Sequence, residues 1–190
     1  EHPHEAVGGG DVWLRDLARN TQTRLTFGGH NTSPIWSPDG TRIALGSNVP
    51  ASGQPSGDLY GGVFNLYEKR ADGTGDMTVL LDSVAAKLPP GWKQPTSWSP
   101  DGQLIIFEVL DPRTSYSISA LPLTGDRTPR PLLRTEFQEV EGQISPDGRW
   151  LAYTSNETRR LEVYVRPLSA SAGKWQISTG GATYPRWRRD

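Results

Sequence analysis

The chain of 190 residues contains no cysteine, 3 histidines and 1 methionine. The lack of cysteine excludes disulfide bonds and thiolate chemistry, and it leaves the cellular compartment open. A histidine-rich metal centre lacks ligands, because zinc sites need three or four fixed side chains. His2 and His4 belong to the polar first ten residues, and His30 follows two glycines. We therefore assign none of the histidines to a metal.

Strong charge of one sign and long apolar runs are also missing. The 20 Lys and Arg residues nearly balance the 21 Asp and Glu residues, with a formal net charge of −1. A binding surface for nucleic acid or for an anionic membrane is therefore not expected. No apolar stretch is long enough for a transmembrane helix, so we expect no membrane insertion.

The signature motifs of several enzyme classes are absent as well. The chain has no G-x-S-x-G nucleophile elbow and none of the glycine-rich loop, H-R-D and D-F-G motifs of protein kinases. Gly8-Gly9-Gly10 lacks the lysine that follows in a phosphate-binding loop. Because no complete catalytic constellation is present, we expect a protein that is not an enzyme.

Glycine, proline and tryptophan are abundant, with 21, 16 and 7 copies. They gather in one repeated motif, which occurs as Trp36-Ser37-Pro38-Asp39-Gly40, Trp98-Ser99-Pro100-Asp101-Gly102 and Ile144-Ser145-Pro146-Asp147-Gly148. Trp187-Arg188-Arg189-Asp190 resembles the start of a fourth copy. Proline suits the second position of a type I turn, Asp the third, and Gly accepts the left-handed conformation that leads into the next strand. Each copy predicts a tight hairpin in which Pro, Asp and Gly have structural roles.

Strand-like segments surround each turn in the same order. A continuous apolar run follows each turn, at 42–45, 104–107 and 150–153, and two further short strands come after it. Continuous apolar runs indicate strands that are covered on both faces. Four strands per repeat make the blade of a propeller. We predict an all-β propeller of four-stranded antiparallel blades, whereas a two-layer sandwich would show more alternation along each strand.

The aligned repeats set the domain boundaries. Residues 1–10 are predicted to be a flexible tail, and 11–190 the propeller, with blades at about 31–83, 94–135 and 139–179. Residues 11–28 correspond to the two outer strands of a blade, and 183–187 to the inner strand of the next blade. The segment 48–62 is an insertion rich in Gly, Pro and Ser, which predicts a surface loop.

The closing blade therefore lacks its second strand. Three arrangements are open: a four-bladed ring with one deficient blade, an arc of a larger ring, or two chains that complete one another. Open edge strands and uncovered sheet faces promote association. We expect self-association or truncation from a longer chain.

With these repeats, residues 11–190 resemble the TolB-like, WD-repeat-like bacterial propellers. Several short segments are similar to the propellers attached to some bacterial serine/threonine protein kinases. These segments are residues 121–127, 145–153, 155–158 and 174–181. The resemblance implies a propeller used for binding, commonly outside the cytoplasm. It implies no catalytic residue within the propeller.

Candidate binding residues occur in the inner strands, where the repeats differ from one another. Two aligned columns show this variation: Ser33, Pro95, Glu141 and Tyr184, and Ile35, Ser97, Gln143 and Arg186. Variation at one face of a repeated scaffold is typical of a binding site, and drift in an idle channel would also produce it. We predict a site for a protein or small-molecule ligand at Ser33, Ile35, Ser97, Glu139, Glu141, Gln143, Tyr184 and Arg186.

Acidic residues support two alternatives. Glu136, Glu139 and Glu141 could hold Ca²⁺, which takes six to eight oxygen ligands, although a solvated rim is the simpler interpretation; no other cofactor is expected. The alternative function is a propeller enzyme that acts on carbohydrate or peptide through Glu139, Glu141 and Arg186. We assign the turn aspartates to the turns and not to catalysis.

Overall fold

The computed structural model describes residues 10–49, 63–111, 115–169 and 173–188. No helix occurs among these residues, and so none of them could cross a membrane as a helix. Their strands form three four-stranded antiparallel sheets and one two-stranded hairpin. The predicted all-β architecture of propeller blades is confirmed. The predicted tail, apart from Gly10, and nearly all of the insertion lie outside the described residues.

The strands follow the order of the repeats, and within each sheet neighbours in sequence are neighbours in space. The hairpin consists of β1 (Trp13–Asp16) and β2 (Thr21–Arg24). Blade A consists of β3 (Asn31–Trp36), β4 (Arg42–Ser47), β5 (Asn65–Arg70) and β6 (Thr78–Leu81). Blade B consists of β7 (Lys93–Trp98), β8 (Leu104–Asp111), β9 (Ser115–Pro122) and β10 (Arg130–Leu133). Blade C consists of β11 (Glu139–Ile144), β12 (Trp150–Ser155), β13 (Glu162–Pro167) and β14 (Trp175–Gln176).

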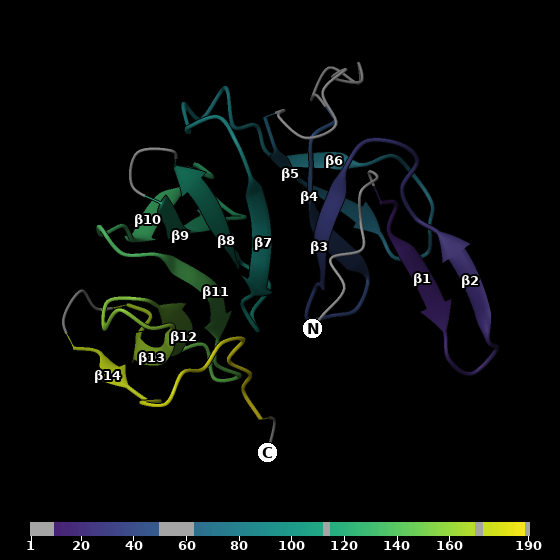
Figure 1. Cartoon of the computed structure of the whole chain (residues 1–190). Helices are drawn as coiled ribbons and strands as arrows, with labels where there is room; N and C mark the ends of the chain where they lie inside the picture. The colour runs from purple at the N-terminus through teal and green to yellow at the C-terminus, as the bar shows by residue number, and fades with distance from the viewer. Residues whose placement is uncertain (1–9, 50–62, 112–114, 170–172, 189–190) are drawn as a thin grey trace.

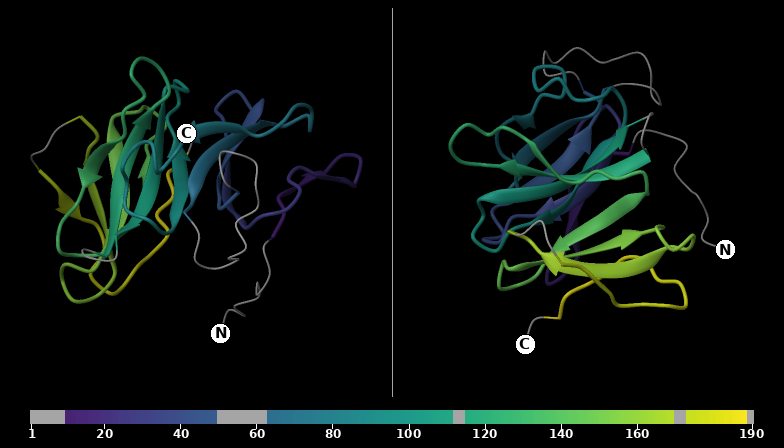
Figure 2. Two further views of the ribbon diagram at one scale, coloured as in Figure 1. Left: turned by 90° about the horizontal axis from the view of Figure 1, so that it is seen from above. Right: turned by 90° about the vertical axis from the view of Figure 1, so that its left-hand side faces the viewer.

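The blades are arranged as an arc around a common centre. Figure 1 shows the inner strands β3, β7 and β11 nearest this centre, with the β1–β2 hairpin at one end of the arc and blade C at the other. The view from above shows the same succession from the hairpin to blade C (Figure 2). Both ends of the arc therefore present a sheet to the outside.

One set of hydrogen bonds builds all three Pro-Asp-Gly turns. In the first, Ser37 Oγ donates to Asp39 Oδ1 at 2.6 Å and accepts the N–H of Arg42 at 2.9 Å. Gly40 has a φ of 70°, which glycine adopts without strain. The same bonds recur around Ser99 and Ser145. The serine of the motif thus joins the turn to the strand that follows it.

Each inner strand contains a bulge. Thr32 and Ile35 of β3 pair with Gly46 and Ala44, so that β3 has one residue more than its partner strand. The pairings of β7 with β8 and of β11 with β12 have the same extra residue. The left-handed residues are Ser33 in β3, with a φ of 48°, and Glu141 in β11, with a φ of 62°. A bulge of this kind bends a strand and redirects its side chains.

The core consists of three apolar layers between successive sheets. One layer lies between the hairpin and blade A and includes Val12, Leu25 and Tyr67. The second joins blades A and B, and the third joins blades B and C. Because blades A and B are covered on both faces, their central strands are largely apolar, as the sequence predicts. Burial of these layers is the main force that holds the blades side by side.

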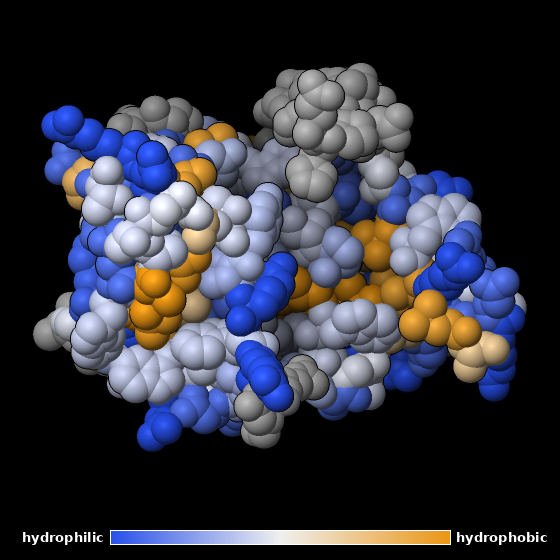
Figure 3. Space-filling model, turned by 60° about the horizontal axis from the view of Figure 1, so that its bottom comes forward, coloured by the Kyte–Doolittle hydropathy of each residue, from blue (hydrophilic) through white to orange (hydrophobic). Residues whose placement is uncertain are grey.

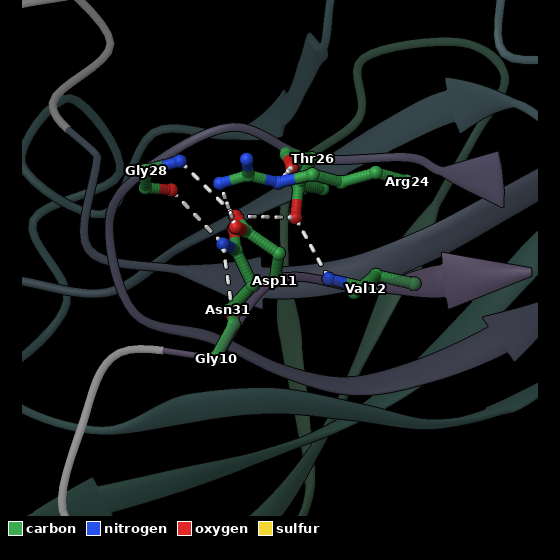
Figure 4. Close-up of polar contacts among 7 residues, drawn as sticks. All are labelled: Gly10, Asp11, Val12, Arg24, Thr26, Gly28 and Asn31. Atoms are coloured by element: carbon green, nitrogen blue, oxygen red, sulfur yellow. Dashed lines mark hydrogen bonds and ion pairs between the residues drawn. The ribbon is translucent and has the colours of Figure 1, made fainter.

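The β1–β2 hairpin is built like the outer half of a blade. Thr26 Oγ1 accepts the N–H of Val12 at 2.8 Å and donates to Asp11 Oδ1, which also accepts the N–H of Gly28 at 3.0 Å (Figure 4). Blade C has the same three bonds. Ser178 Oγ accepts the N–H of Val163 and donates to Glu162, which also accepts the N–H of Gly181. The hairpin thus has the place of a third and a fourth strand.

The segment 183–187, predicted as an inner strand, forms no ladder, and no second strand lies beside it among the described residues. It nevertheless keeps two features of an inner strand. Tyr184 has a φ of 56°, as Ser33 and Glu141 have at the equivalent positions. Its backbone N–H donates to the Glu141 carboxylate of β11, and Trp187 Nε1 donates to the carbonyl of Gln143 at 2.9 Å. The segment is therefore docked on blade C.

Candidate functional site

A hollow of about 880 Å³ lies where the inner strands end and the turns begin. Its walls come from β3, β7, β11 and the segment 183–188. Figure 3 looks toward this end of the molecule and shows apolar surface extending from the middle of the face toward the hairpin. The volume is within the range of small-ligand sites, although this hollow is open to one side.

Four of the predicted binding residues meet at this hollow. Ile35, Ser97, Gln143 and Arg186 all line it, and each comes from a different inner segment. They form one of the two aligned columns of the sequence. The equivalent places of successive repeats thus converge on one space, as the symmetry of a propeller requires.

The wall on the side of blade C is hydrogen-bonded to its neighbour. Ser97 Oγ accepts the N–H of Ile144 at 3.0 Å. Thr96 Oγ1 donates to the carbonyl of Gly142 at 2.8 Å, and Gln143 Nε2 donates to the carbonyl of Thr96 at 2.6 Å. These bonds join the inner strands of blades B and C directly.

The wall on the side of blade A is apolar. The positions of Thr96 and Ser97 are taken in β3 by Pro34 and Ile35, which offer no side-chain hydrogen bond. Trp36 and Pro38 continue this wall. The hollow is therefore amphipathic, with Ile35, Trp36 and Pro38 on one side and Gln143 and Arg186 on the other.

Sequence reasoning missed the tryptophans and prolines of the hollow. Trp36, Trp98 and Trp187 line it together with Pro38, Pro100 and Pro146. Trp98 is nearly buried and donates to the carbonyl of Gly102 at 3.2 Å, whereas the side chain of Trp36 is 54% exposed. We assigned these residues to the turn motif alone. A large exposed aromatic side chain in a repeated structural motif is the signal that could have identified them.

The other column serves a different purpose, because Ser33, Glu141 and Tyr184 do not line the hollow. Ser33 Oγ donates to Gln94 Oε1 at 2.7 Å, and Gln94 Nε2 donates to Glu108 Oε2 at 2.7 Å. Glu108 Oε1 accepts the N–H of Glu141 at 2.5 Å, and Glu141 in turn accepts the N–H of Tyr184. A polar chain thus links blades A, B and C and the last segment.

Burial affects Glu108 in this polar chain. Glu108 is 3% exposed, and its burial raises the pKa of its carboxyl group above the ordinary value. The N–H of Glu141 and the amide of Gln94 act in the opposite direction, because they stabilise the ionised form. Glu108 and Glu141 thus each accept the N–H of a left-handed residue in the next inner segment, Glu141 and Tyr184 respectively.

Glu139, another of the predicted binding residues, does not line the hollow. It is 4% exposed, and Thr135 Oγ1 donates to its Oε1 at 2.8 Å. Burial raises the pKa of this carboxyl group. Asn31 and Lys93, which also begin inner strands, bond in the same way to the loops before them, to Gly28 and Pro89 respectively. The side chain of the first residue in each inner strand is thus hydrogen-bonded to the loop that precedes the strand.

The three glutamates considered for Ca²⁺ have separate environments. Glu136 is exposed in the loop before β11, Glu139 bonds to Thr135, and Glu141 accepts from Thr154 Oγ1 at 2.7 Å. Among the residues that the structure describes, no group of three or more His, Asp or Glu side chains could hold a metal ion. The described residues therefore do not assemble the calcium site that the sequence allows.

No family model matches the chain. Several solved structures do resemble it. TolB from Acinetobacter baumannii is 18% identical with a TM-score of 0.67, over 88% of this chain and 37% of that one. A puromycin-hydrolysing peptidase from Mycobacterium tuberculosis is 15% identical with a TM-score of 0.63, over 90% and 28% of the two chains. The propeller domain of the trilobed protease from Pyrococcus furiosus, described as having an open velcro topology, is 12% identical with a TM-score of 0.56, over 88% and 46%.

The similar proteins include both a TolB and peptidases, so the similarity identifies a fold and not an activity. The chain spans 37% of the length of the TolB chain. The particular resemblance to kinase-attached propellers stays a prediction. With its three four-stranded blades and docked inner segment, the chain has the TolB-like β-propeller fold.

Proposed function

We propose that the chain is a non-catalytic recognition module that binds an extended acidic peptide segment in the hollow. The observation that carries this proposal is the convergence of Ile35, Ser97, Gln143 and Arg186 from four successive inner segments. They vary in chemistry between repeats, whereas the Ser-Pro-Asp-Gly residues are the same in the three complete turns.

The chemistry of the walls supports a ligand with an apolar and an anionic part. Ile35, Trp36 and Pro38 offer apolar and aromatic surface, which suits proline, aromatic and aliphatic side chains. The guanidinium of Arg186 has no carboxylate within ion-pair distance among the described residues. Arginine binds carboxylates with two parallel hydrogen bonds, and so an acidic side chain or a C-terminal carboxylate fits this position.

The alternative of a propeller enzyme has less support. Its proposed residues do not meet, because Glu139 bonds to Thr135 at the start of β11 and Glu141 holds the N–H of Tyr184, while Arg186 lies in the hollow. Hydrolytic catalysis by a pair of carboxylates needs both of them beside the substrate. The similarity to peptidase structures, which is a similarity of fold, is the observation in favour of the enzyme.

An array of ten-residue peptides that vary in proline, aromatic and acidic content tests the proposal. The best peptide, labelled with a fluorophore, is titrated by anisotropy with the wild type, Arg186→Gln and Trp36→Ala. We expect each substitution to raise the Kd about tenfold or more, as for Arg and Trp residues at the centre of interfaces.

Two substitutions provide matched controls. Arg19→Gln changes an arginine with an 82% exposed side chain at the β1–β2 turn, and Trp175→Ala changes a tryptophan that is 52% exposed, close to the 54% of Trp36. Both should leave the Kd unchanged. Equal losses for the controls and the hollow variants would contradict the proposal. Cleavage of the peptides that Glu141→Gln abolishes would favour the enzyme.

A further inference from the structure

The hairpin end of the arc carries an exposed tryptophan where blades A and C carry buried tyrosines. The shared hydrogen bonds of Thr26 and Ser178 align Val12 with Val163, so that Trp13 has the place of Tyr164 in blade C and of Tyr67 in blade A. Tyr67 is 3% exposed and Tyr164 is 2% exposed, because the preceding unit of the arc covers each of them. Trp13 is 56% exposed, since no unit precedes the hairpin among the described residues.

The residues that cover Tyr164 show what Trp13 lacks. Tyr164 packs in one apolar cluster with Ile118, Ala120 and Leu133 of blade B. Ile118 pairs with Leu133 across β9 and β10, so the cluster is the outer part of one sheet face. A flat aromatic side chain of the following unit closes this face.

Blade C presents the equivalent face without a cover. Val163, Val165 and Ile177 have the places of Ile118, Ala120 and Leu133, because Val163 accepts the N–H of Ile177 just as β9 pairs with β10. Val163 and Val165 are half-buried, and Ile177 is 62% exposed. Trp175, which pairs with Val165, is 52% exposed on the same face. The docked segment 183–187 bonds to β11 and leaves this outer part open.

The two ends are therefore the two halves of one blade-to-blade contact. We propose that they bind each other between copies of this chain, with Trp13 of one copy packed on Val163, Val165 and Ile177 of a second copy. The second copy is the occupant that the structure favours, because each molecule carries both halves and the blade B–blade C layer shows how such halves fit. Among the described residues, no strand pairs with the edge of β1 opposite β2, so this edge is also open to a partner.

Such a contact is heterologous, since different surfaces of the two copies meet. A heterologous contact leaves one free half at each end of a dimer, so assembly continues until a ring closes or a filament forms. This consequence distinguishes the proposal from a symmetric dimer, which stops at two copies.

Sedimentation velocity over a series of protein concentrations tests the proposal with two charged variants. Trp13→Glu destroys the hairpin half and Ile177→Glu the blade C half, and both residues are exposed, so the fold should persist in circular dichroism. We expect the wild type to form species larger than a dimer and each variant alone to be monomeric. An equimolar mixture should form a one-to-one heterodimer and nothing larger, because one intact half remains on each variant.

Val84→Glu is the matched control, because Val84 is 70% exposed in the turn after β6, away from both halves. It should assemble like the wild type. A wild type that stays monomeric at every concentration would overturn the second copy as occupant and leave a further blade of a longer chain in its place. A variant that dimerises alone, or a mixture that stays monomeric, would also overturn the head-to-tail contact.

Discussion

The hydroxyl group of Thr26 donates to the carboxylate of Asp11, and the chain repeats this relationship between Ser178 and Glu162 of blade C. In both places a residue shortly after the outermost strand is tied to a residue at or just before the start of the strand that pairs with it. The strands themselves are short, and those of the hairpin have only 4 residues each. Side-chain hydrogen bonds at the strand ends therefore supply part of the stabilisation that backbone hydrogen bonds would give in longer strands.

Substitution of Thr26 should loosen the hairpin. Thr26→Val keeps the shape of the side chain but leaves the N–H of Val12 and the carboxylate of Asp11 without this partner, and Thr26 is 2% exposed. We expect the free energy of unfolding in urea to fall by about 1–3 kcal/mol. Thr183→Val, at an exposed position, is the control and should change it little. Unchanged amide exchange in β1 and β2 of the Thr26 variant would contradict this role.

Acid should weaken the three turns. The hydroxyl groups of Ser37 and Ser145 lower the pKa of Asp39 and of Asp147 to about 2, and Ser99 lowers the pKa of Asp101. A carboxyl group with a lowered folded-state pKa contributes stability above its unfolded pKa and loses it as the pH falls through the folded pKa. We therefore expect a loss of stability between about pH 4 and pH 2.

The measurement for the turns is urea unfolding at several pH values. Asp147→Asn, which cannot ionise, should reduce the slope of stability against pH in this window. Glu139→Gln should act only above this window, because the raised pKa of Glu139 gives the wild type a gain in stability as the pH falls from the folded-state pKa to the ordinary value, and the variant lacks this gain. The same slope for the wild type and Asp147→Asn would contradict the assignment.

A rise in pH should increase the stability of the protein through Lys93. This lysine is fully buried, its Nζ donates to the carbonyl oxygens of Pro89 and Gly91, and burial lowers its pKa to about 8. Below pH 8 it is protonated in both states, and the folded state bears the cost of a buried charge. Stability should therefore rise by about 2–3 kcal/mol between about pH 8 and pH 10.5.

Lys93→Met removes this titration while it keeps the length of the side chain. We expect the variant to show no rise attributable to this site when unfolding is followed up to pH 10.5. Lys87→Met, at an exposed position in the turn before β7, is the control and should keep the rise. If the wild type has a flat profile in this range, the charge of Lys93 is not excluded from water as the structure indicates.

The repeated turn carried most of the fold prediction. The Trp-Ser-Pro-Asp-Gly copies located the inner and second strands in all three blades, because turn chemistry is local and each residue has a specific reason to be there. The second strand of each blade was equally clear, since burial on both faces leaves a continuous apolar run.

The candidate site was less accessible to such reasoning. The aligned columns at Glu141 and Gln143 are two residues apart and look alike in the sequence. A bulge with a left-handed residue at Glu141 separates their roles, so that Gln143 lines the hollow and Glu141 bonds to Tyr184. The bond of Glu139 to Thr135 depends on how the preceding loop folds back. Neither feature has a signature in a single sequence.

The bond from Glu108 to the backbone of Glu141 has one more implication. The bulge of blade C is held by a side chain of blade B, and Glu141 holds the next left-handed residue in the same way. A blade moved to another position in the order would keep its strands and its Pro-Asp-Gly turn. It would lose the hydrogen bond from the glutamate of its neighbour. The blades thus share one architecture but cannot replace one another, and their order along the chain contributes to stability.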